Sequence, residues 1–267
     1  MSGFEWLKPA ELSTVIINAV KAKHPFSMLR FGDGEYEICK HICGKADRDV
    51  FYARFARWFG KQEIPYQQMC GIADAVCQAF QGCDLVGIPC FREAYGYPKW
   101  IGVEGFMRDR NMYPKPAFYF YDIYTLWRDF DTFKHILTGR KDLYTISSRD
   151  VAEGLQKRYK VHNVHQFLLC PEYFLWKGTD AGVAKFITEY KGSRHYPERY
   201  TEIMQWIRDN APLNGKLFLV GAGALGKIYC HEIRKCGGMA LDIGAMFDGW
   251  AGVTTRPYLQ PGDLFKL

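Results

Sequence analysis

A glycine-rich turn near the carboxyl end of the chain constrains the fold more than any other feature. Residues 217–220 form an uninterrupted apolar run, which is typical of a buried strand in a parallel sheet. The run leads directly into Gly221-x-Gly223-x-x-Gly226, and a helical pattern follows. A strand that enters a helix through such a turn is a unit of a Rossmann-like α/β fold. We therefore expect a largely parallel central sheet flanked by helices.

The same turn admits two functional interpretations. A second strand is expected over 238–243, and it carries Asp242 at the spacing from Gly221 at which a dinucleotide-binding fold places an acid for the ribose. This pattern favours NAD(P). However, little chain follows the turn, whereas a full dinucleotide fold continues for further strand and helix units. The same glycines can also hold the diphosphate of a nucleotide sugar.

A second motif lies near the amino end, where an apolar run ends in alternating glycines and acids. These four residues are Gly32, Asp33, Gly34 and Glu35. Two carboxylates this close repel each other unless a cation lies between them, so the pattern predicts a divalent metal or an arginine, and Arg30 is near enough in sequence to be that arginine. Alternatively, Asp33 caps a helix expected over 36–43.

Residues 29–35, Leu-Arg-Phe-Gly-Asp-Gly-Glu, resemble the opening motif of the GT-D fold glycosyltransferases, formerly a domain of unknown function, whose signature is Asp-x-Glu. Residues 217–227, with Asp-Ile-Gly at 242–244, are similar to a second motif of that family in order and separation. The resemblance implies a Rossmann-like GT-D type fold, with residues 1–267 as a single domain. Where the family often has a histidine soon after that glycine, this chain has Ala245.

The resemblance also implies a site. Asp33 and Glu35 become the catalytic residues and the ligands of Mn²⁺ or Mg²⁺. The residues expected to bind the nucleotide sugar are Arg30, Gly32, Gly34, Ser148, Arg149, Gly221, Gly223 and Asp242.

Ser148 and Arg149 are also candidates on their own chemistry. They end a strand expected over 141–149 and precede a helix expected over 151–159, where backbone N–H groups, a hydroxyl and a guanidinium can hold phosphate. A simple helix cap remains an alternative. For a general base the sequence offers several acids without choosing among them: Glu93, Glu104, Asp242 and Asp248.

Hydrophobic periodicity predicts the remaining elements. Helices are expected over 4–23, 45–57, 66–80, 179–190 and 197–209, and strands over 83–89 and 161–169. The loop 90–100 carries Arg92 and Glu93 as candidate substrate contacts. The aromatic segment 113–130 is either core or a platform for an acceptor sugar.

Composition narrows the function classes. The net charge of +6 is mild and is not gathered into a basic tract, which argues against a nucleic-acid partner and suits anionic small ligands or an anionic membrane face. Nine scattered cysteines indicate a reduced, cytoplasmic protein. No apolar run approaches the length of a transmembrane helix, so any membrane contact is expected to be peripheral.

The sequence thus favours a metal-dependent, hexosyltransferase-like enzyme of polysaccharide biosynthesis. It would move a sugar from a nucleotide-diphosphate donor, with UDP-sugars favoured, to a glycan, glycolipid or glycoprotein. An NAD(P)-dependent oxidoreductase is the first alternative, and a non-catalytic nucleotide- or carbohydrate-binding module is the second.

Overall fold

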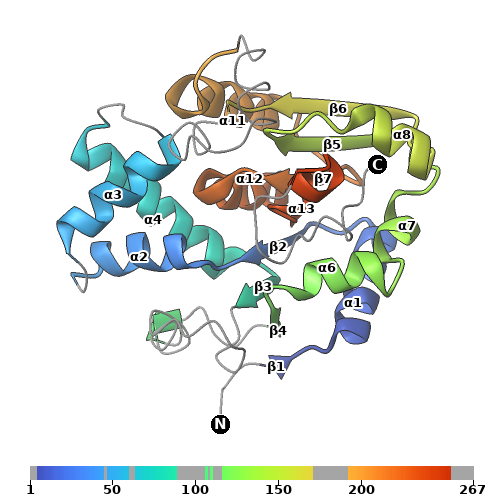
Figure 1. The fold of residues 1–267 in the computed structure, drawn as a ribbon, viewed down its shortest axis with the longest axis horizontal. Coiled ribbons are helices and arrows are strands. Elements are labelled where there is room, and N and C mark those ends of the chain that lie inside the picture. Colours follow the sequence, from blue (N-terminus) through green and yellow to red (C-terminus); the bar gives the residue numbers. More distant parts are fainter. Residues whose placement is uncertain are drawn as a thin grey trace.

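The central feature of the molecule is a parallel sheet (Figure 1). The computed structural model describes residues 5–44, 47–59, 64–88, 106–107, 109–110, 116–170 and 192–253, except the side chains of Asp33 and Arg57. Within them the strands are β1 (Glu5–Trp6), β2 (Phe26–Arg30), β3 (Leu85–Ile88), β4 (Pro116–Tyr119), β5 (Asp142–Ser147), β6 (Asn163–Leu168), β7 (Leu217–Gly221) and β8 (Met239–Asp242). Their spatial order is β1-β4-β3-β2-β8-β7-β5-β6. All neighbouring strands pair in parallel, which confirms the predicted fold class.

Strand β8 joins the two halves of the sheet. Leu241 of β8 lies beside Met28 of β2 on one side and beside Leu219 of β7 on the other. Parallel strands end at the same edge of a sheet, so the loops that follow β2, β8, β7 and β5 are neighbours. Motifs from the two ends of the chain therefore meet at that edge.

Helices cover both faces of the sheet. One face is covered by α2 (Asp33–Ile42), α3 (Arg48–Phe59), α4 (Tyr66–Gly82), α11 (Tyr200–Asp209) and α12 (Gly223–Lys235). The other is covered by α1 (Pro9–Ala22), α6 (Asp122–Arg128), α7 (Thr132–Leu137), α8 (Ala152–Tyr159) and α13 (Met246–Trp250).

Strand β7 packs against the helices on both faces of the sheet. Its side chains alternate in direction, so Phe218 and Val220 enter the core beneath α12, whereas Leu217 and Leu219 enter the core on the opposite face. This explains the continuous apolar run, since both faces of the strand are buried.

Two predicted helices need correction at their starts. The first helix begins at Pro9 rather than at residue 4, because proline lacks an N–H and is favoured in the first helical turn, and Glu5–Trp6 forms the edge strand β1 instead. The second helix begins at Asp33 rather than at residue 36. The aromatic segment contains β4 and α6, and its Phe118 is fully buried. The predicted helix 179–190 and the loop 90–100 lie outside the described residues.

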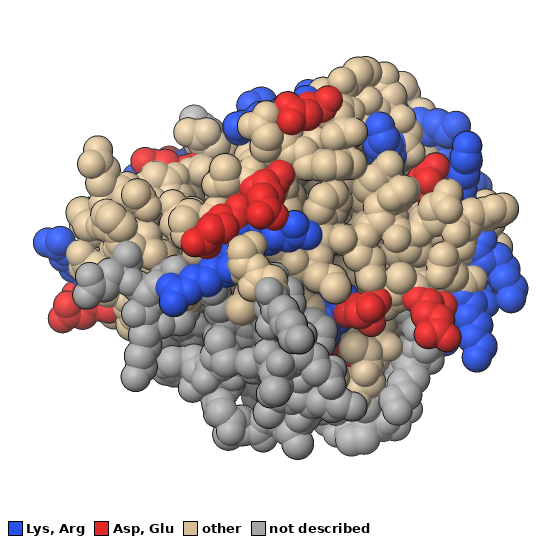
Figure 2. All heavy atoms as spheres, turned by 90° about the horizontal axis from the view of Figure 1, so that it is seen from above, with Lys and Arg blue, Asp and Glu red and all other residues tan. Residues whose placement is uncertain are grey.

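Charges of both signs are interspersed over the face seen in Figure 2, and several basic side chains lie at its right-hand end. In Figure 1, α1, α7 and α8 lie at that end of the molecule. None of the helices in the described ranges has both the length and the hydropathy needed to cross a bilayer.

A buried histidine gives the fold an acid-sensitive point. His195 lies in a short turn, η2 (His195–Arg199), and its Nε2 is 3.2 Å from the hydroxyl oxygen of Tyr229. Burial, together with the positive charge of Arg199, lowers the pKa of His195 to about 3. The unfolded chain binds a proton near pH 6.5 but the folded chain does not, so acid favours unfolding.

We therefore expect His195 to make the free energy of unfolding fall by about 1.4 kcal/mol per pH unit below about pH 6.5. Urea unfolding of the wild type and of His195→Gln, between about pH 7 and pH 4, measures the difference in slope. The control is His162→Gln, because the His162 side chain is exposed. Equal slopes for wild type and His195→Gln would contradict this assignment.

Candidate active site

The residues predicted from sequence converge on the carboxyl edge of the sheet. Strand β2 ends at Arg30, and β8 ends at Asp242, which lies beside Val220 of β7. Gly221, the last residue of β7, lies beside Ser147, the last residue of β5. The acidic motif, the glycine turn and the Ser148–Arg149 pair therefore occupy adjacent loops.

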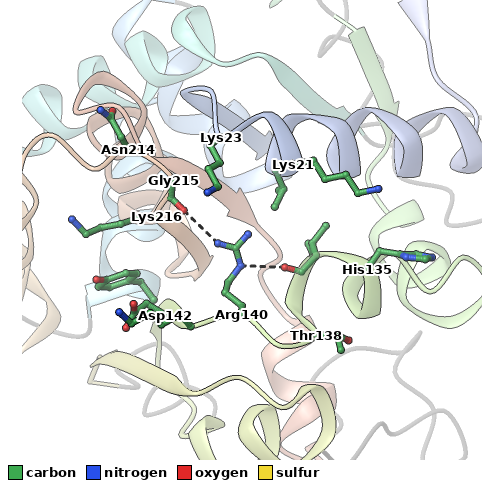
Figure 3. A pocket seen from close by; sticks show the side chains of 13 residues that line it. Lys21, Lys23, His135, Thr138, Arg140, Asp142, Asn214, Gly215 and Lys216 are labelled. Atoms are coloured by element: carbon green, nitrogen blue, oxygen red, sulfur yellow. Dashed lines mark hydrogen bonds between the residues drawn. The ribbon is translucent and has the colours of Figure 1, made fainter.

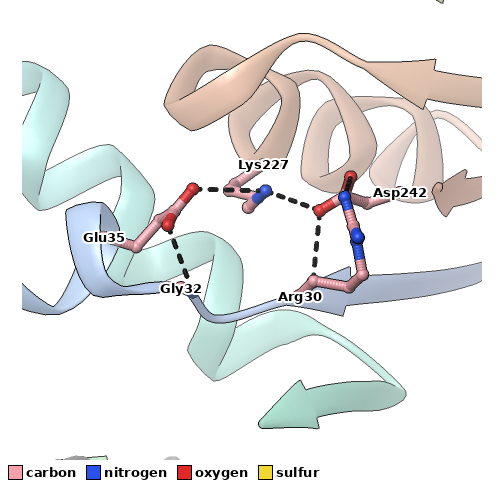
Figure 4. Close-up of polar contacts among 5 residues, drawn as sticks. All are labelled: Arg30, Gly32, Glu35, Lys227 and Asp242. Carbon is pink, nitrogen blue, oxygen red and sulfur yellow. Dashed lines mark hydrogen bonds and ion pairs between the residues drawn. The ribbon is translucent and has the colours of Figure 1, made fainter. Parts of the chain in front are cut away.

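Four charged side chains connect these loops (Figure 4). Nζ of Lys227, on α12, lies 2.5 Å from Oδ2 of Asp242 and 3.3 Å from Oε1 of Glu35. Arg30 donates its backbone N–H to Oδ2 of Asp242 at 3.2 Å and its Nη2 to Oδ1 at 3.5 Å. The network thus joins β2, α2, α12 and β8 through alternating cations and carboxylates.

The network is buried, which makes its charge balance consequential. Asp242 is 2% exposed, and Arg30, Lys227 and Glu35 are each below 9%. Burial opposes protonation of Lys227, but the Asp242 and Glu35 carboxylates outweigh it and raise the pKa of the lysine. Burial likewise opposes ionisation of Asp242, but Lys227 and Arg30 outweigh it and lower the pKa of that carboxyl. The ion pairs of Lys227 with Asp242 and Glu35 therefore depend on a protonated lysine and ionised carboxylates.

Glu35 also stabilises the start of α2. Its Oε2 accepts the backbone N–H of Gly32 at 3.1 Å, so its carboxylate binds one donor with each oxygen. Asp33 is the first residue of α2, and its side chain lies outside the described residues. Gly34 follows, and a Cβ at this position would overlap the ring of Trp58. Close packing therefore explains the second glycine of the motif.

Arg30 requires a glycine on β8's loop. Gly244 has a φ of +47°, and a Cβ there would overlap the Arg30 guanidinium. The guanidinium also lies 4.6 Å from the ring centroid of Phe120, which follows β4. Phe120 thus brings one ring of the predicted aromatic platform to the site, whereas Tyr119 stacks on Trp6 at 4.8 Å.

The glycine turn places the amino end of α12 at the same edge. Gly221 ends β7, Gly223 begins α12 with a φ of +56°, and Lys227 lies one turn further on. The first N–H groups of a helix have no partner within the helix and attract anions. The α12 start therefore has the chemistry to bind a phosphate group beside the buried network.

The loop after β5 is held by its own contacts. Arg149 donates Nε to Oδ1 of Asp248 at 2.8 Å, and both residues are buried. The backbone N–H of Arg149 donates to the Ser147 hydroxyl oxygen at 3.1 Å, and that hydroxyl donates to the Arg149 carbonyl at 2.9 Å. Ser148 is half-buried.

The structure describes two of the four candidate general bases. Asp242 and Asp248 are buried in ion pairs with cations. Glu93 and Glu104 lie outside the described residues. The assignment of Asp242 as a ribose ligand stays a prediction, and its present contacts do not favour it because a ribose would have to displace them.

The described donors fit a divalent cation poorly. Within the described ranges no three His, Cys, Asp or Glu side chains form a group suited to a metal. Glu35, one of the two predicted ligands, already uses both oxygens on Lys227 and on the Gly32 N–H. In this arrangement Lys227 supplies the positive charge that the acidic motif requires.

Sequence reasoning missed Lys227 as a site residue. The residue stands alone as a cation within Ala-Leu-Gly-Lys-Ile-Tyr-Cys, residues 224–230, all of which are buried. A single lysine surrounded by apolar residues on every side of a helix indicates a buried charge, and a buried charge requires a partner. That pattern was the available signal.

Solved structures resemble this chain over most of its length. One is described as the highly conserved domain of unknown function 1792 with a distinct glycosyltransferase fold; it shares 17% identity, with a TM-score of 0.54, over 93% of this chain and 82% of that one. Another, a new glycosyltransferase of the same domain type from Streptococcus sanguinis, shares 15% identity, with a TM-score of 0.52, over 92% of this chain and 84% of that one. At these identities the likeness shows the fold.

No curated protein is similar enough in sequence to match. A family model does match: the GT-D-like family, described as a GT-D fold-like domain, covers residues 7–250. That span includes both motifs, the whole of the sheet from β2 to β8 and all four members of the buried network. The chain therefore belongs to the GT-D-like family, as its two motifs predict.

Proposed function

We propose that this protein is a glycosyltransferase that moves a sugar from a nucleotide-diphosphate donor to a glycan, glycolipid or glycoprotein. A UDP-sugar is the favoured donor, a hexose the favoured sugar and polysaccharide biosynthesis the favoured setting. Family membership supports the reaction class. The observation that carries the proposal is the contact of Lys227 with Glu35 and Asp242, because it couples the acidic motif to the helix of the glycine turn.

In this proposal the protein stabilises charge on the departing nucleotide diphosphate. The N–H groups at the start of α12 would donate hydrogen bonds to phosphate oxygens, and Arg149, whose Nε also donates to Asp248, would add the positive charge of its guanidinium from the adjacent loop. The buried network would hold α2, α12 and the β8 loop in fixed relation, so that these donors are oriented before the donor sugar binds. Preorganised donors of this kind supply much of the rate enhancement in such reactions.

In this proposal Asp33 would hold Mn²⁺ or Mg²⁺. A bound divalent cation would supply Lewis-acid stabilisation of the diphosphate. Because the Glu35 oxygens have other partners, we assign Glu35 to positioning Lys227 and the start of α2 instead.

The oxidoreductase alternative is less well supported. It needs the Asp242 carboxylate to accept hydrogen bonds from ribose hydroxyl groups, as in dinucleotide-binding folds. That carboxylate is 2% exposed and binds Lys227 and Arg30. The non-catalytic alternative predicts ligand binding without turnover.

A ligand panel tests the proposal directly. The protein is melted with UDP-, GDP-, CMP- and dTDP-sugars and with NAD(P)H, each with Mn²⁺, Mg²⁺ or EDTA. We expect a UDP-sugar with Mn²⁺ or Mg²⁺ to raise the melting temperature, since a ligand at about 100 times its dissociation constant stabilises by about 2.7 kcal/mol. Release of UDP from the bound donor, measured with candidate acceptors, then tests turnover.

Two results would contradict the proposal. A shift with NAD(P)H that persists in EDTA, without any response to nucleotide sugars, would favour the oxidoreductase. Binding of a nucleotide sugar with no transfer to water or to any acceptor would favour the binding module.

A further inference from the structure

A basic pocket lies at the edge of the sheet opposite to the candidate active site (Figure 3). It has a volume of about 520 Å³. Its walls come from the end of α1, the connection from α7 to β5 and the turn before β7. These segments precede the amino ends of β2, β5 and β7, whereas the active-site loops follow the carboxyl ends of the same strands. The two sites are therefore separated by the length of the strands.

The charge of the pocket is strongly one-sided. Five of its lining residues are lysines or arginines: Lys21, Lys23, Arg140, Lys141 and Lys216. Asp142 is the single carboxylate among the described lining residues, and it already binds His165 and Asn163. Within the described ranges none of the five cations forms an ion pair. The described lining residues therefore carry an excess of positive charge.

Arg140 gives the pocket a fixed centre. Its Nε donates to the Ile136 carbonyl at 3.2 Å and its Nη1 to the Gly215 carbonyl at 3.3 Å, as the dashed lines in Figure 3 mark. The carbonyls orient the guanidinium but do not neutralise it, and burial lowers the pKa of Arg140. Its Nη2 has no acceptor in the part of the chain that the structure describes, so it remains available to an oxyanion.

Lys23 reinforces this centre from the opposite wall. It caps α1 in a left-handed conformation, with a φ of +56°, and Figure 3 shows its side chain directed toward Arg140. Lys21 extends from the last turn of α1 along the upper wall of the same pocket. Lys23 and Arg140 carry like charges, and an anion between them would offset their repulsion.

We propose that this pocket binds a phosphate-bearing anion, either a free oligophosphate or the headgroup of an anionic lipid. A preoriented guanidinium beside exposed lysine side chains suits several phosphate oxygens at once. The site does not use the glycine turn or the acidic motif, so the inference does not depend on the proposed transferase activity.

The experiment measures how the full chain binds phosphate from two sources. Calorimetry with inorganic pyrophosphate in EDTA measures binding of a free phosphate compound. Sedimentation with phosphatidylcholine vesicles, with or without phosphatidylglycerol, measures binding to the lipid headgroup. The pocket variant is Lys21→Gln with Lys23→Gln, both at exposed positions. The matched control is Lys8→Gln with Lys40→Gln, which removes the same charge from residues that do not line the pocket.

We expect the pocket variant to weaken binding about tenfold or more in one of the two arms, whereas the control stays close to wild type. Loss confined to pyrophosphate identifies a free ligand, and loss confined to phosphatidylglycerol vesicles identifies a membrane surface. Equal weakening by both variants would reduce the effect to net charge and overturn the proposal. So would the absence of binding in both arms.

Discussion

Replacing Lys227 with methionine is expected to lower the free energy of unfolding by about 3–5 kcal/mol and to abolish donor binding. The substitution keeps an unbranched side chain of similar length but removes the positive charge. Asp242 and Glu35 then remain buried without their shared cation, and among the described cations only Arg30 still contacts Asp242. An uncompensated buried carboxylate is among the largest single-residue penalties in a folded protein. Urea unfolding near neutral pH measures the loss.

The control for this prediction lies on the same helix. Lys235 pairs with Glu232 at 3.5 Å, and its side chain is 58% exposed, so Lys235→Met should cost less than about 1 kcal/mol. Adding Asp242→Asn to Lys227→Met should restore part of the lost stability, because it removes one stranded charge. If Lys227→Met costs no more than Lys235→Met, the buried network does not support the fold as described.

Asp33→Asn and Glu35→Gln are expected to lower the rate of sugar transfer in two different ways. Asp33→Asn should reduce it about 100-fold or more at a fixed Mn²⁺ concentration and should raise the Mn²⁺ concentration needed for half-maximal rate. Glu35→Gln should reduce the rate about 10- to 100-fold even in saturating Mn²⁺, because it disturbs Lys227 and the start of α2. Transfer rates measured over a Mn²⁺ titration separate the two effects.

Several outcomes bear on this assignment. Recovery of the Glu35→Gln rate by added Mn²⁺ would make Glu35 a metal ligand, as the sequence alone predicts. Full activity of both variants would remove the acidic motif from the mechanism. Thermal unfolding of each variant shows whether a lost rate reflects a lost fold.

The sequence predicted those elements in which one local signal determines the structure. Residues 66–80 repeat apolar residues at helical spacing, and α4 runs from Tyr66 to Gly82 with Met69, Ile72 and Val76 buried. By contrast, β1 is two residues long and pairs only with β4 among the described strands, so no periodic pattern could identify it. Its backbone pairing is specified by a distant strand rather than by its own residues.

The site residues likewise divide into those with a local sequence signal and those without one. Glycines and acids after apolar runs indicated where β2 and β7 end, because turn chemistry is local. The partners of Glu35 and Asp242 could not be found in this way. Lys227 reaches both carboxylates only because β8 lies beside β2 and α12 packs over that junction, and this neighbourhood depends on tertiary structure.

The position of β8 also determines when the sheet can be completed during synthesis. Strands β4, β3 and β2 form one group of neighbours and β7, β5 and β6 another, and in the described structure they meet only through β8. Met28 must therefore wait for Leu241, near the end of the described chain, before its strand gains its second neighbour. Pairing over so long a stretch of sequence slows folding. While the ribosome is still making β8, the inner edges of both groups remain open to any other strand, so a chaperone that covers them until translation ends should raise the yield of native protein.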